Sequence, residues 1–259
     1  MEHCTPVAYP FEPGSNLQKC ENKLTDEENL VLHRIPYQQA VGSLLYLAQS
    51  TRPYVSYAVE VLSRFNSNYR KIHWEAVKRI MQYIKGTVNV GQTFRKSGTT
   101  EIESFCDADY ASDLHQWLST TGYIFKLAGT AVSWTSKRQQ TVALSTTEAE
   151  YMALSAAGQK AVYLQGLLRE LCVTHSEKSV SVCCDNRDAI ALCHNGVHHP
   201  RTKHIDVRHH YIRDLIKTRK FSVKPVNIDK QQADFLTKVL PKRKHQWCCQ
   251  AVGLSEFTN

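Results

Sequence analysis

The stretch SWTSKRQQTVALSTTEAEYMALS, residues 133–155, contains the end of one predicted element and the start of another. Alternating residues over 131–137 predict a β-strand, and apolar residues at helical spacing predict a helix over about 146–172. Ser145 and Glu148 form the S-x-x-E pattern of a capping box at the start of that helix. A strand that leads into a long helix indicates an α/β fold.

The segments around this stretch extend the pattern. Further strands are predicted at 102–108, 122–128, 180–184 and 221–228, and further helices at 186–195, 204–217 and 230–238. Gly129-Thr130, between the second and third strands, predicts a hairpin turn. The predicted order from residue 102 onward is therefore β-β-β-α-β-α-α-β-α.

The part of the chain before residue 100 has a different character. Helical periodicity predicts segments over 37–50, from Thr51 onward, and over 71–85, and one short strand is expected within 87–100. Residues 1–35 are polar and contain several prolines, which predicts an irregular lead-in with at most a short helix near 25–33.

Four acidic residues lie at the ends of predicted elements. Asp107 ends a strand, Glu150 lies in the first turns of the long helix, Asp185 follows the fourth strand, and Asp234 lies in the last helix. Strand ends beside helix starts gather functional groups in α/β folds. Because no cationic partner is apparent for them, their mutual repulsion predicts a bound hard cation such as Mg²⁺.

Three neighbouring acids are separated from this set. Glu148 and Glu150 lie about 200° apart around a helix, so they cannot both face one site, and we assign Glu148 to the helix cap. Asp109 shares a face with Asp107 only if the strand continues through it. Asp229 is expected to be the N-cap of the last helix.

The composition limits the class of protein. The net charge is +8, and residues 201–245 alone hold 13 Lys and Arg against four Asp, which fits a polyanion partner and a solvated face about equally well. The nine cysteines are scattered and lack a CxxC pair, which predicts neither a disulfide framework nor a zinc site, and the Cys/His residues near 193–199 match no standard site. With no apparent signal peptide or transmembrane segment, a cytoplasmic or nuclear protein without membrane contact is expected.

Several stretches resemble one family. FCDADYAS (105–112), SWTSKRQQTVALSTTEAEYMALS (133–155), VCCDNRDAIAL (182–192), RTKHIDVRHHYIRDLI (201–216) and QQADFLTKVLP (231–241) resemble the ribonuclease H region of copia-type retrotransposon Pol polyproteins. PYQQAVGSLLYLAQSTRP (36–53) and HWEAVKRIMQYIKGT (73–87) are similar to the region just after the polymerase palm. The pairing of TKHIDVRHH with ALSTTEAEYMAL is highly specific to this family.

The resemblance implies a ribonuclease H-like α/β fold, a mixed five-stranded sheet flanked by helices and preceded by a small helical region. It divides the chain into a lead-in (1–35), a remnant of the reverse transcriptase thumb or connection (36–100), a ribonuclease H-like domain (101–241) and a C-terminal tail (242–259). It implies cleavage of RNA in RNA–DNA hybrids with two Mg²⁺ or Mn²⁺ ions and no small-molecule cofactor. Its catalytic and metal-binding acids match Asp107, Glu150, Asp185 and Asp234. The rest of the reverse transcriptase is a further possible partner.

Basic residues are candidates for contact with the nucleic-acid backbone. Lys137 and Arg138 follow the third strand, and a second group lies near Asp185 in the sequence: Arg201, Lys203, His204 and Arg208. For Lys137 and Arg138, a solvated hairpin end is an equally good interpretation.

The chain also departs from the family pattern. The paired aspartates of a polymerase are absent, so no polymerase activity is expected from this chain alone. Residues 115–118 read HQWL where the family carries a basic pair. Two hypotheses follow: an active ribonuclease H, or a domesticated or decayed fragment that binds nucleic acid or another protein without cleaving.

Overall fold

The computed structural model describes residues 3–12, 14, 17–18, 24–94, 101–113, 115–173, 179–194 and 203–256, without the side chains of 203–206. Its main sheet has five strands: β2 (Glu103–Asp109), β3 (Thr120–Leu127), β4 (Thr130–Arg138), β5 (Val180–Cys184) and β6 (Phe221–Pro225). Their order across the sheet is β4-β3-β2-β5-β6. The pairs β2–β3 and β3–β4 are antiparallel, whereas β2–β5 and β5–β6 are parallel. The expected mixed five-stranded sheet is confirmed.

The turn between β3 and β4 is the predicted hairpin, shifted by one residue. Ala128 and Gly129 both have positive φ, 52° and 79°, as a two-residue turn with the twist of its strands requires. Thr130 already belongs to β4. The hairpin places the end of β4, and with it Lys137, at the same end of the sheet as the start of β3.

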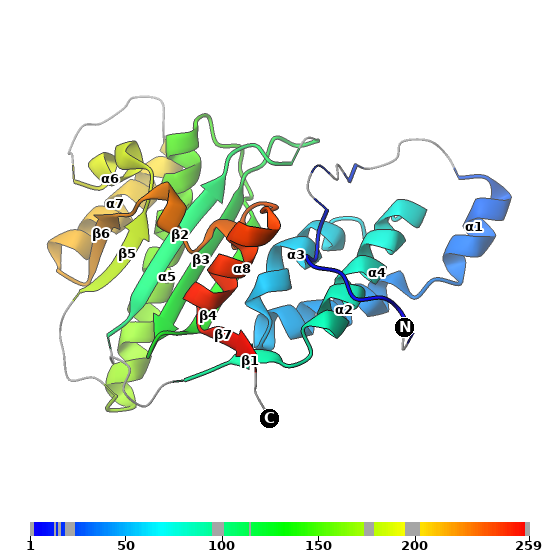
Figure 1. Cartoon of the computed structure of the whole chain (residues 1–259). Coiled ribbons are helices and arrows are strands. Elements are labelled where there is room, and N and C mark those ends of the chain that lie inside the picture. Colours follow the sequence, from blue (N-terminus) through cyan, green and yellow to red (C-terminus); the bar gives the residue numbers. More distant parts are fainter. Residues whose placement is uncertain are drawn as a thin grey trace.

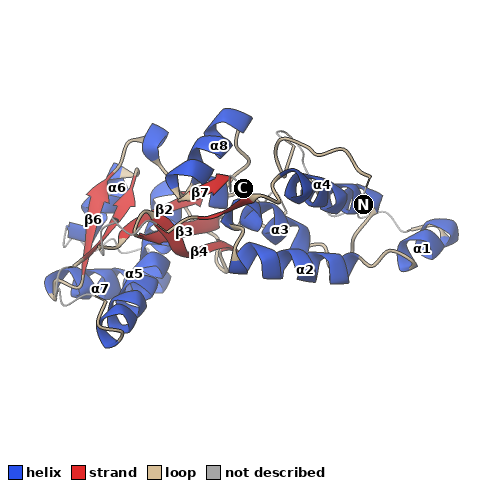
Figure 2. Cartoon of the chain, turned by 60° about the horizontal axis from the view of Figure 1, so that its bottom comes forward, coloured by secondary structure: helices blue, strands red, loops and turns tan. Residues whose placement is uncertain are grey.

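One face of the sheet is covered by three helices: α5 (Thr146–Glu170), α6 (Arg187–His194) and α7 (Lys203–Lys217). Figure 2 shows α5 and α7 on this side and α8 (Lys242–Ala251) on the other. Leu154 and Ala161 of α5 share a core with Val182 of β5 and Phe221 of β6, and this core is closed to water. The apolar stripe predicted for the long helix is therefore its contact with the sheet.

The second face is covered by elements from both ends of the chain. The helices α2 (Tyr37–Ser50), α3 (Ser56–Ser63) and α4 (Lys71–Gly86) lie on this side with the short helical turns η1 (Pro53–Val55), η2 (Ile228–Lys230) and η3 (Asp234–Leu236). Helix α1 (Asp26–His33) lies at the far end of this helical region, away from the sheet (Figure 1). Residues of α2–α4 form one hydrophobic core with Ile124 of β3, Phe235 of η3 and Cys248 of α8. The indole Nε1 of Trp134 in β4 donates to the Ala48 carbonyl of α2 at 2.8 Å. The helical region therefore packs directly against the sheet (Figure 1).

The segment expected to be a tail contains ordered structure. Besides α8 it holds strand β7 (Leu254–Glu256), which pairs antiparallel with β1 (Val90–Gln92). The short strand predicted within 87–100 is thus confirmed, and its partner is a segment that sequence reasoning left without structure. Among the described residues, no helix has the length and apolar character needed to cross a membrane.

The helix predicted over 230–238 does not form. Two separate turns, η2 and η3, stand in its place, and Asn227 rather than Asp229 caps the first, with its Oδ1 accepting from the Asp229 amide at 2.9 Å. The cause is Gln231, which is fully buried: its Nε2 donates to the Cys106 carbonyl at 2.9 Å. This hydrogen bond to β2 stabilises a sharp change of chain direction at Gln231. A regular helix through this residue would not make that turn.

Candidate active site

Asp107 lies in β2, the central strand of the sheet, and is 2% exposed. Its partner in the register with β3 is Gly122. A Cβ at Gly122 would lie 2.6 Å from Cγ2 of Thr237 and 2.8 Å from Cβ of Leu236, so only glycine lets this segment lie against β3. The close approach brings the Thr237 hydroxyl to Asp107, where it donates a hydrogen bond to Oδ2.

Glu150 is placed by the start of α5. Ser145 is the N-cap, as predicted, and its Oγ accepts from the Glu148 amide at 3.1 Å. The Glu148 carboxylate accepts from the Leu144 amide at 2.8 Å, one residue before the position of a standard capping box. Glu148 thus caps the helix, while Glu150 lies next to Cys184, with Oε2 3.9 Å from Sγ.

Asp185 follows β5 directly and is half-buried. Because β2 and β5 run parallel, their carboxyl ends meet at one edge of the sheet, where Asp107 and Asp185 both lie. Ligand atoms of Glu150, Cys184 and Asp185 all lie within 4.8 Å of one another. Elements from three separate parts of the chain therefore meet at this edge.

Asp234 lies in η3 and is 4% exposed. Its Oδ1 is 3.0 Å from Nζ of Lys238, and its Oδ2 is 3.3 Å from Nζ of Lys244. Lys238 also reaches Asp107, with Nζ 3.3 Å from Oδ2. The structure thus brings all four predicted acids to one site, and Asp107 is at its centre.

The electrostatics of the site reflect this crowding. Burial, followed by the charge of Asp107, raises the pKa of both Glu150 and Asp185. Burial also raises the pKa of Asp234, although Lys238 opposes the shift. A site that makes several carboxylates harder to ionise favours the binding of a cation that neutralises them.

Strand β2 continues through Asp109, which therefore shares a face of the sheet with Asp107. Burial is the first cause that raises the pKa of Asp109 to about 6, and the charge of Asp107 adds to it. The sequence predicts that Asp109 shares a face with Asp107 only if the strand continues, and it does. Asp109 lies near the acids but does not contact Cys184, as Glu150 does, or Thr237, as Asp107 does.

The expectation that the acids lack cationic partners is wrong. Burial lowers the pKa of Lys238, but Asp107 and Asp234 raise it by more, so the net shift is upward. Lys238 and Thr237 both belong to the stretch QQADFLTKVLP, yet neither was singled out from the sequence. A lysine four residues after an acid is a common helical pair, and only the fold shows that it also reaches Asp107.

The donor set of the site fits a hard divalent cation. Carboxylate oxygens of Glu150 and Asp185 lie within 4.8 Å of each other, and Asp107 is close enough for its charge to raise the pKa of both. Such oxygens are the ligands that Mg²⁺ and Mn²⁺ prefer. The surroundings of Asp234 fit less well, because two lysine ammonium groups already lie beside its carboxylate.

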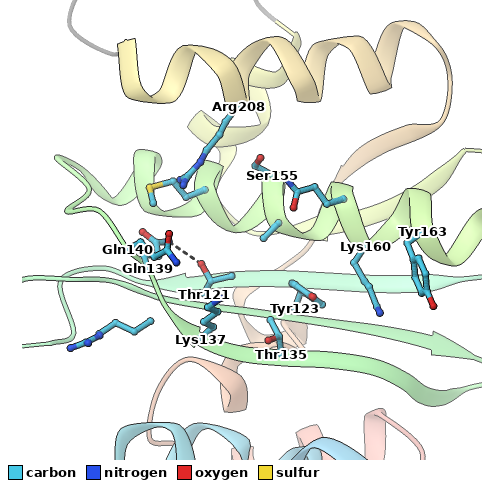
Figure 3. A pocket seen from close by; sticks show the side chains of 14 residues that line it. Thr121, Tyr123, Thr135, Lys137, Gln139, Gln140, Ser155, Lys160, Tyr163 and Arg208 are labelled. Carbon is cyan, nitrogen blue, oxygen red and sulfur yellow. Dashed lines mark hydrogen bonds between the residues drawn. The ribbon is translucent and has the colours of Figure 1, made fainter. Parts of the chain in front are cut away.

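A basic groove of roughly 570 Å³ lies on the α5 side of the sheet, between β3, β4, α5 and α7. Figure 3 shows Lys137, Lys160 and Arg208 around it, with Gln139 and Gln140 at one end. No aspartate or glutamate is among its described lining residues. The groove therefore suits an anionic ligand.

Only some of the residues predicted to contact nucleic acid line the basic groove. Lys137, Arg138 and Arg208 line the basic groove, but Arg138 is also paired with Asp113, with Nη1 2.6 Å from Oδ2. Arg201 lies outside the described residues, as do 195–200 of the Cys/His segment. Lys203 and His204 begin α7, and their side chains are not described. Lys160 is a groove residue that the sequence reading did not identify.

Comparison with known proteins finds relatives that match nearly the whole chain. No family model matches it. It is 41% identical over 254 residues to the retrovirus-related Pol polyprotein from transposon TNT 1-94 of Nicotiana tabacum, covering 98% of this chain and 19% of that protein. The corresponding polyprotein from transposon RE1 of Arabidopsis thaliana is 38% identical over 251 residues, 96% of this chain and 16% of that protein. The chain thus spans less than a fifth of the length of these relatives.

Shorter relatives and solved structures are also similar. A secreted RxLR effector protein of Plasmopara viticola, number 161, is 49% identical over 133 residues, which is 51% of this chain and 94% of that protein. LC11-RNase H1, isolated from compost, aligns with a TM-score of 0.41 and 17% identity over 54% of this chain and 94% of that one.

Sequence identity to the two plant polyproteins over nearly the whole chain agrees with the motifs and with the observed strand order. The chain therefore belongs to the retrovirus-related Pol polyproteins of copia-type retrotransposons, and its five-stranded domain has the ribonuclease H-like fold.

Proposed function

We propose that the chain cleaves the RNA strand of an RNA–DNA hybrid with the help of divalent cations. The observation that carries the proposal is the convergence of Asp107, Glu150, Asp185 and Asp234 at the edge of the sheet where β2 and β5 end. The four come from separate elements, and three of them are buried while Asp185 is half-buried, so a chance surface cluster does not account for their mutual electrostatic coupling.

Each side chain has a distinct role in this proposal. Asp107, Glu150 and Asp185 would hold Mg²⁺ or Mn²⁺, which supplies an activated water and stabilises the departing 3′ oxygen when bound. Thr237 orients Asp107 through its hydrogen bond to Oδ2. Glu150 is held rigidly because it sits in the second turn of a capped helix.

The basic groove supports nucleic acid as the ligand. Its cations, Lys137, Lys160 and Arg208, surround an opening that carries no acidic side chain among the described residues. Lysine and arginine contacts to phosphates give affinity and position without reading sequence. We propose that the groove holds part of the sugar–phosphate backbone of the hybrid.

The helical region completes the proposal. We propose that 36–100 corresponds to the end of the reverse transcriptase part and 101–241 to the ribonuclease H part of the polyprotein. The shared core of α2–α4 with Ile124 and Phe235 supports a role in which these helices steady the nuclease. The rest of the reverse transcriptase would then be a natural partner.

A hybrid-cleavage assay tests the function. The purified chain should cut a labelled RNA–DNA hybrid only when Mg²⁺ or Mn²⁺ is present, and an Asp107→Asn variant is the matched control. Binding without cleavage by the native chain would reject this proposal. It would favour the second hypothesis, a non-catalytic binding protein, for which the sequence HQWL at 115–118, in place of the family's basic pair, is the supporting observation.

A further inference from the structure

Lys238 occupies an unusual place in the acid cluster. Its Nζ lies 3.3 Å from Oδ2 of Asp107 and 3.0 Å from Oδ1 of Asp234, so one ammonium group bridges two buried carboxylates. The side chains of Asp107 and Asp234 are 3% and 6% exposed. Lys244 adds a second positive charge 3.3 Å from Oδ2 of Asp234.

The other half of the cluster has no direct ion pair of this kind, and the charge of Lys238 reaches it only as a weaker influence on the pKa of Asp185. Over the ranges that the structure describes, no lysine or arginine forms an ion pair with Glu150 or Asp185. The cluster is therefore divided into an Asp107–Asp234 side, whose carboxylates pair directly with lysines, and a Glu150–Asp185 side without such pairs. Only the second side lacks the charge that a divalent cation would bring.

The backbone fixes the position of Lys238. Its amide donates to the Asp234 carbonyl at 3.1 Å, which holds the two residues one turn apart. The preceding residue, Thr237, is fully buried, donates to Asp107 and packs against Gly122. The side chain of Lys238 therefore leaves a rigid segment directly beside Asp107.

We propose that Lys238 takes the place of the second divalent ion, so that the site binds one such ion, which Glu150, Asp185 and Oδ1 of Asp107 would hold, since Lys238 and Thr237 both contact Oδ2 of Asp107. A second divalent cation between Asp107 and Asp234 would be within a few ångströms of an ammonium group, where like charges repel strongly at low dielectric. Lys238 is then a positioning residue that holds Asp107 and Asp234. The inference rests on the proposed function and deepens it by setting the ion count.

Counting bound ions tests the inference without turnover. Mn²⁺ titrated into the full chain and followed by electron paramagnetic resonance should give one tightly bound ion per native chain. Lys238→Gln should bind two, because the amide no longer excludes the second ion. Lys238→Arg should remain at one, and Lys217→Gln, which removes an exposed charge from the end of α7, should also remain at one.

Two results overturn the inference: a native chain that binds two ions, or a folded Lys238→Gln variant that still binds one. Circular dichroism on each variant establishes that it is folded, and the native ion count stands even if Lys238→Gln does not fold. A native chain with two bound ions that still cuts the hybrid would refute the role of Lys238 and leave the proposed function intact. Conversely, a change from one ion to two in a chain that never cuts would support the inference and reject the function.

Discussion

The acid cluster and the basic groove lie on the same sheet but are built in opposite ways. The cluster is buried: Asp107, Glu150 and Asp234 are each 6% exposed or less, and a glycine is required for one of its walls. The groove is open, and its cations extend from the surface of β4, α5 and α7 (Figure 3). Under the proposed function, the fixed geometry of the cluster would serve chemistry, whereas the exposed charges of the groove would serve binding. Substitutions in the cluster should therefore change rates, and substitutions in the groove should change affinity.

The largest effect is expected for Asp107→Asn and Asp185→Asn. Each removes a carboxylate from the proposed cation site, and metal-ion stabilisation of several kcal/mol corresponds to a rate loss of roughly 10³-fold or more. Single-turnover cleavage of a labelled hybrid measures the loss. The free energy of unfolding should not fall for Asp185→Asn, which removes charge from a crowded cluster, whereas Asp107→Asn also breaks the ion pair with Lys238 and should lower it. Cleavage at the native rate by either variant would show that its acid is outside the site.

Glu150→Gln and Glu148→Gln compare two acids of one helix. Glu150→Gln should lose most activity, because a neutral amide cannot balance a divalent cation. Glu148→Gln should keep most of it, because glutamine can still accept the hydrogen bond from the Leu144 amide. Helix content by circular dichroism should be unchanged in both, since the two residues have similar helix propensity. The opposite ranking of activities would assign the metal role to Glu148.

Gly122→Ala tests the close packing of η3 against β3 beside the acid cluster. The added methyl group would meet Thr237 and Leu236 at 2.6 Å and 2.8 Å, and overpacking of this kind costs about 1–3 kcal/mol of unfolding free energy. Activity should fall as well, because η3 carries Asp234. Urea unfolding measures the stability, and Gly42→Ala is the control, since nothing lies within 4 Å of a Cβ at that position. Equal stabilities of the two variants would contradict the close approach of η3 to β3.

The pKa of Asp109, raised from 3.8 to about 6, predicts a pH effect on the metal-free chain. Between those values the folded state holds a proton that the unfolded state has lost, so stability falls as the pH rises from about 4 to about 6. Asp109→Asn should flatten this slope and stabilise the chain at pH 7 by about 1 kcal/mol, allowing for partial solvent screening. Thermal unfolding in the presence of a chelator measures it. A slope that survives the substitution would have to arise from other carboxylates.

The smallest effects are expected in the groove. Lys137→Gln and Lys160→Gln should each weaken hybrid binding a few-fold. Each should also reduce the magnitude of the slope of log affinity against log salt concentration by about 1, the value expected for the loss of one phosphate contact. The rate of cleavage at saturating hybrid concentration should not change, because neither Lys137 nor Lys160 contacts the acid cluster. Fluorescence anisotropy at several salt concentrations provides the slopes, with Lys217→Gln as the control. Slopes equal to that of the native chain would mean that the groove cations are merely solvated.

The strands, the long helix and the four acids were predictable because each has a local signal: alternation, helical spacing, a cap, or an acid where an element ends. Lys238 had no such signal, because its second contact, to Asp107, joins positions 131 residues apart in the sequence. The helix expected over 230–238 failed for a related reason, since buried Gln231 binds the carbonyl of Cys106. Strand β7 has only three residues, too few for alternation to show.

The pairing of β1 with β7 also determines where the chain can be divided. It joins a strand that precedes the nuclease sheet to one that follows it, while α8 buries Cys248 among residues of the helical region. A fragment trimmed to 101–241 would leave Ile124, Ala131 and Phe235 facing water. We therefore expect the helical region, the sheet and α8 to unfold as one unit, which is larger than the segment that carries the nuclease motifs. A fragment cut at the motif boundaries should therefore expose an apolar patch and aggregate, and it should not fold stably by itself.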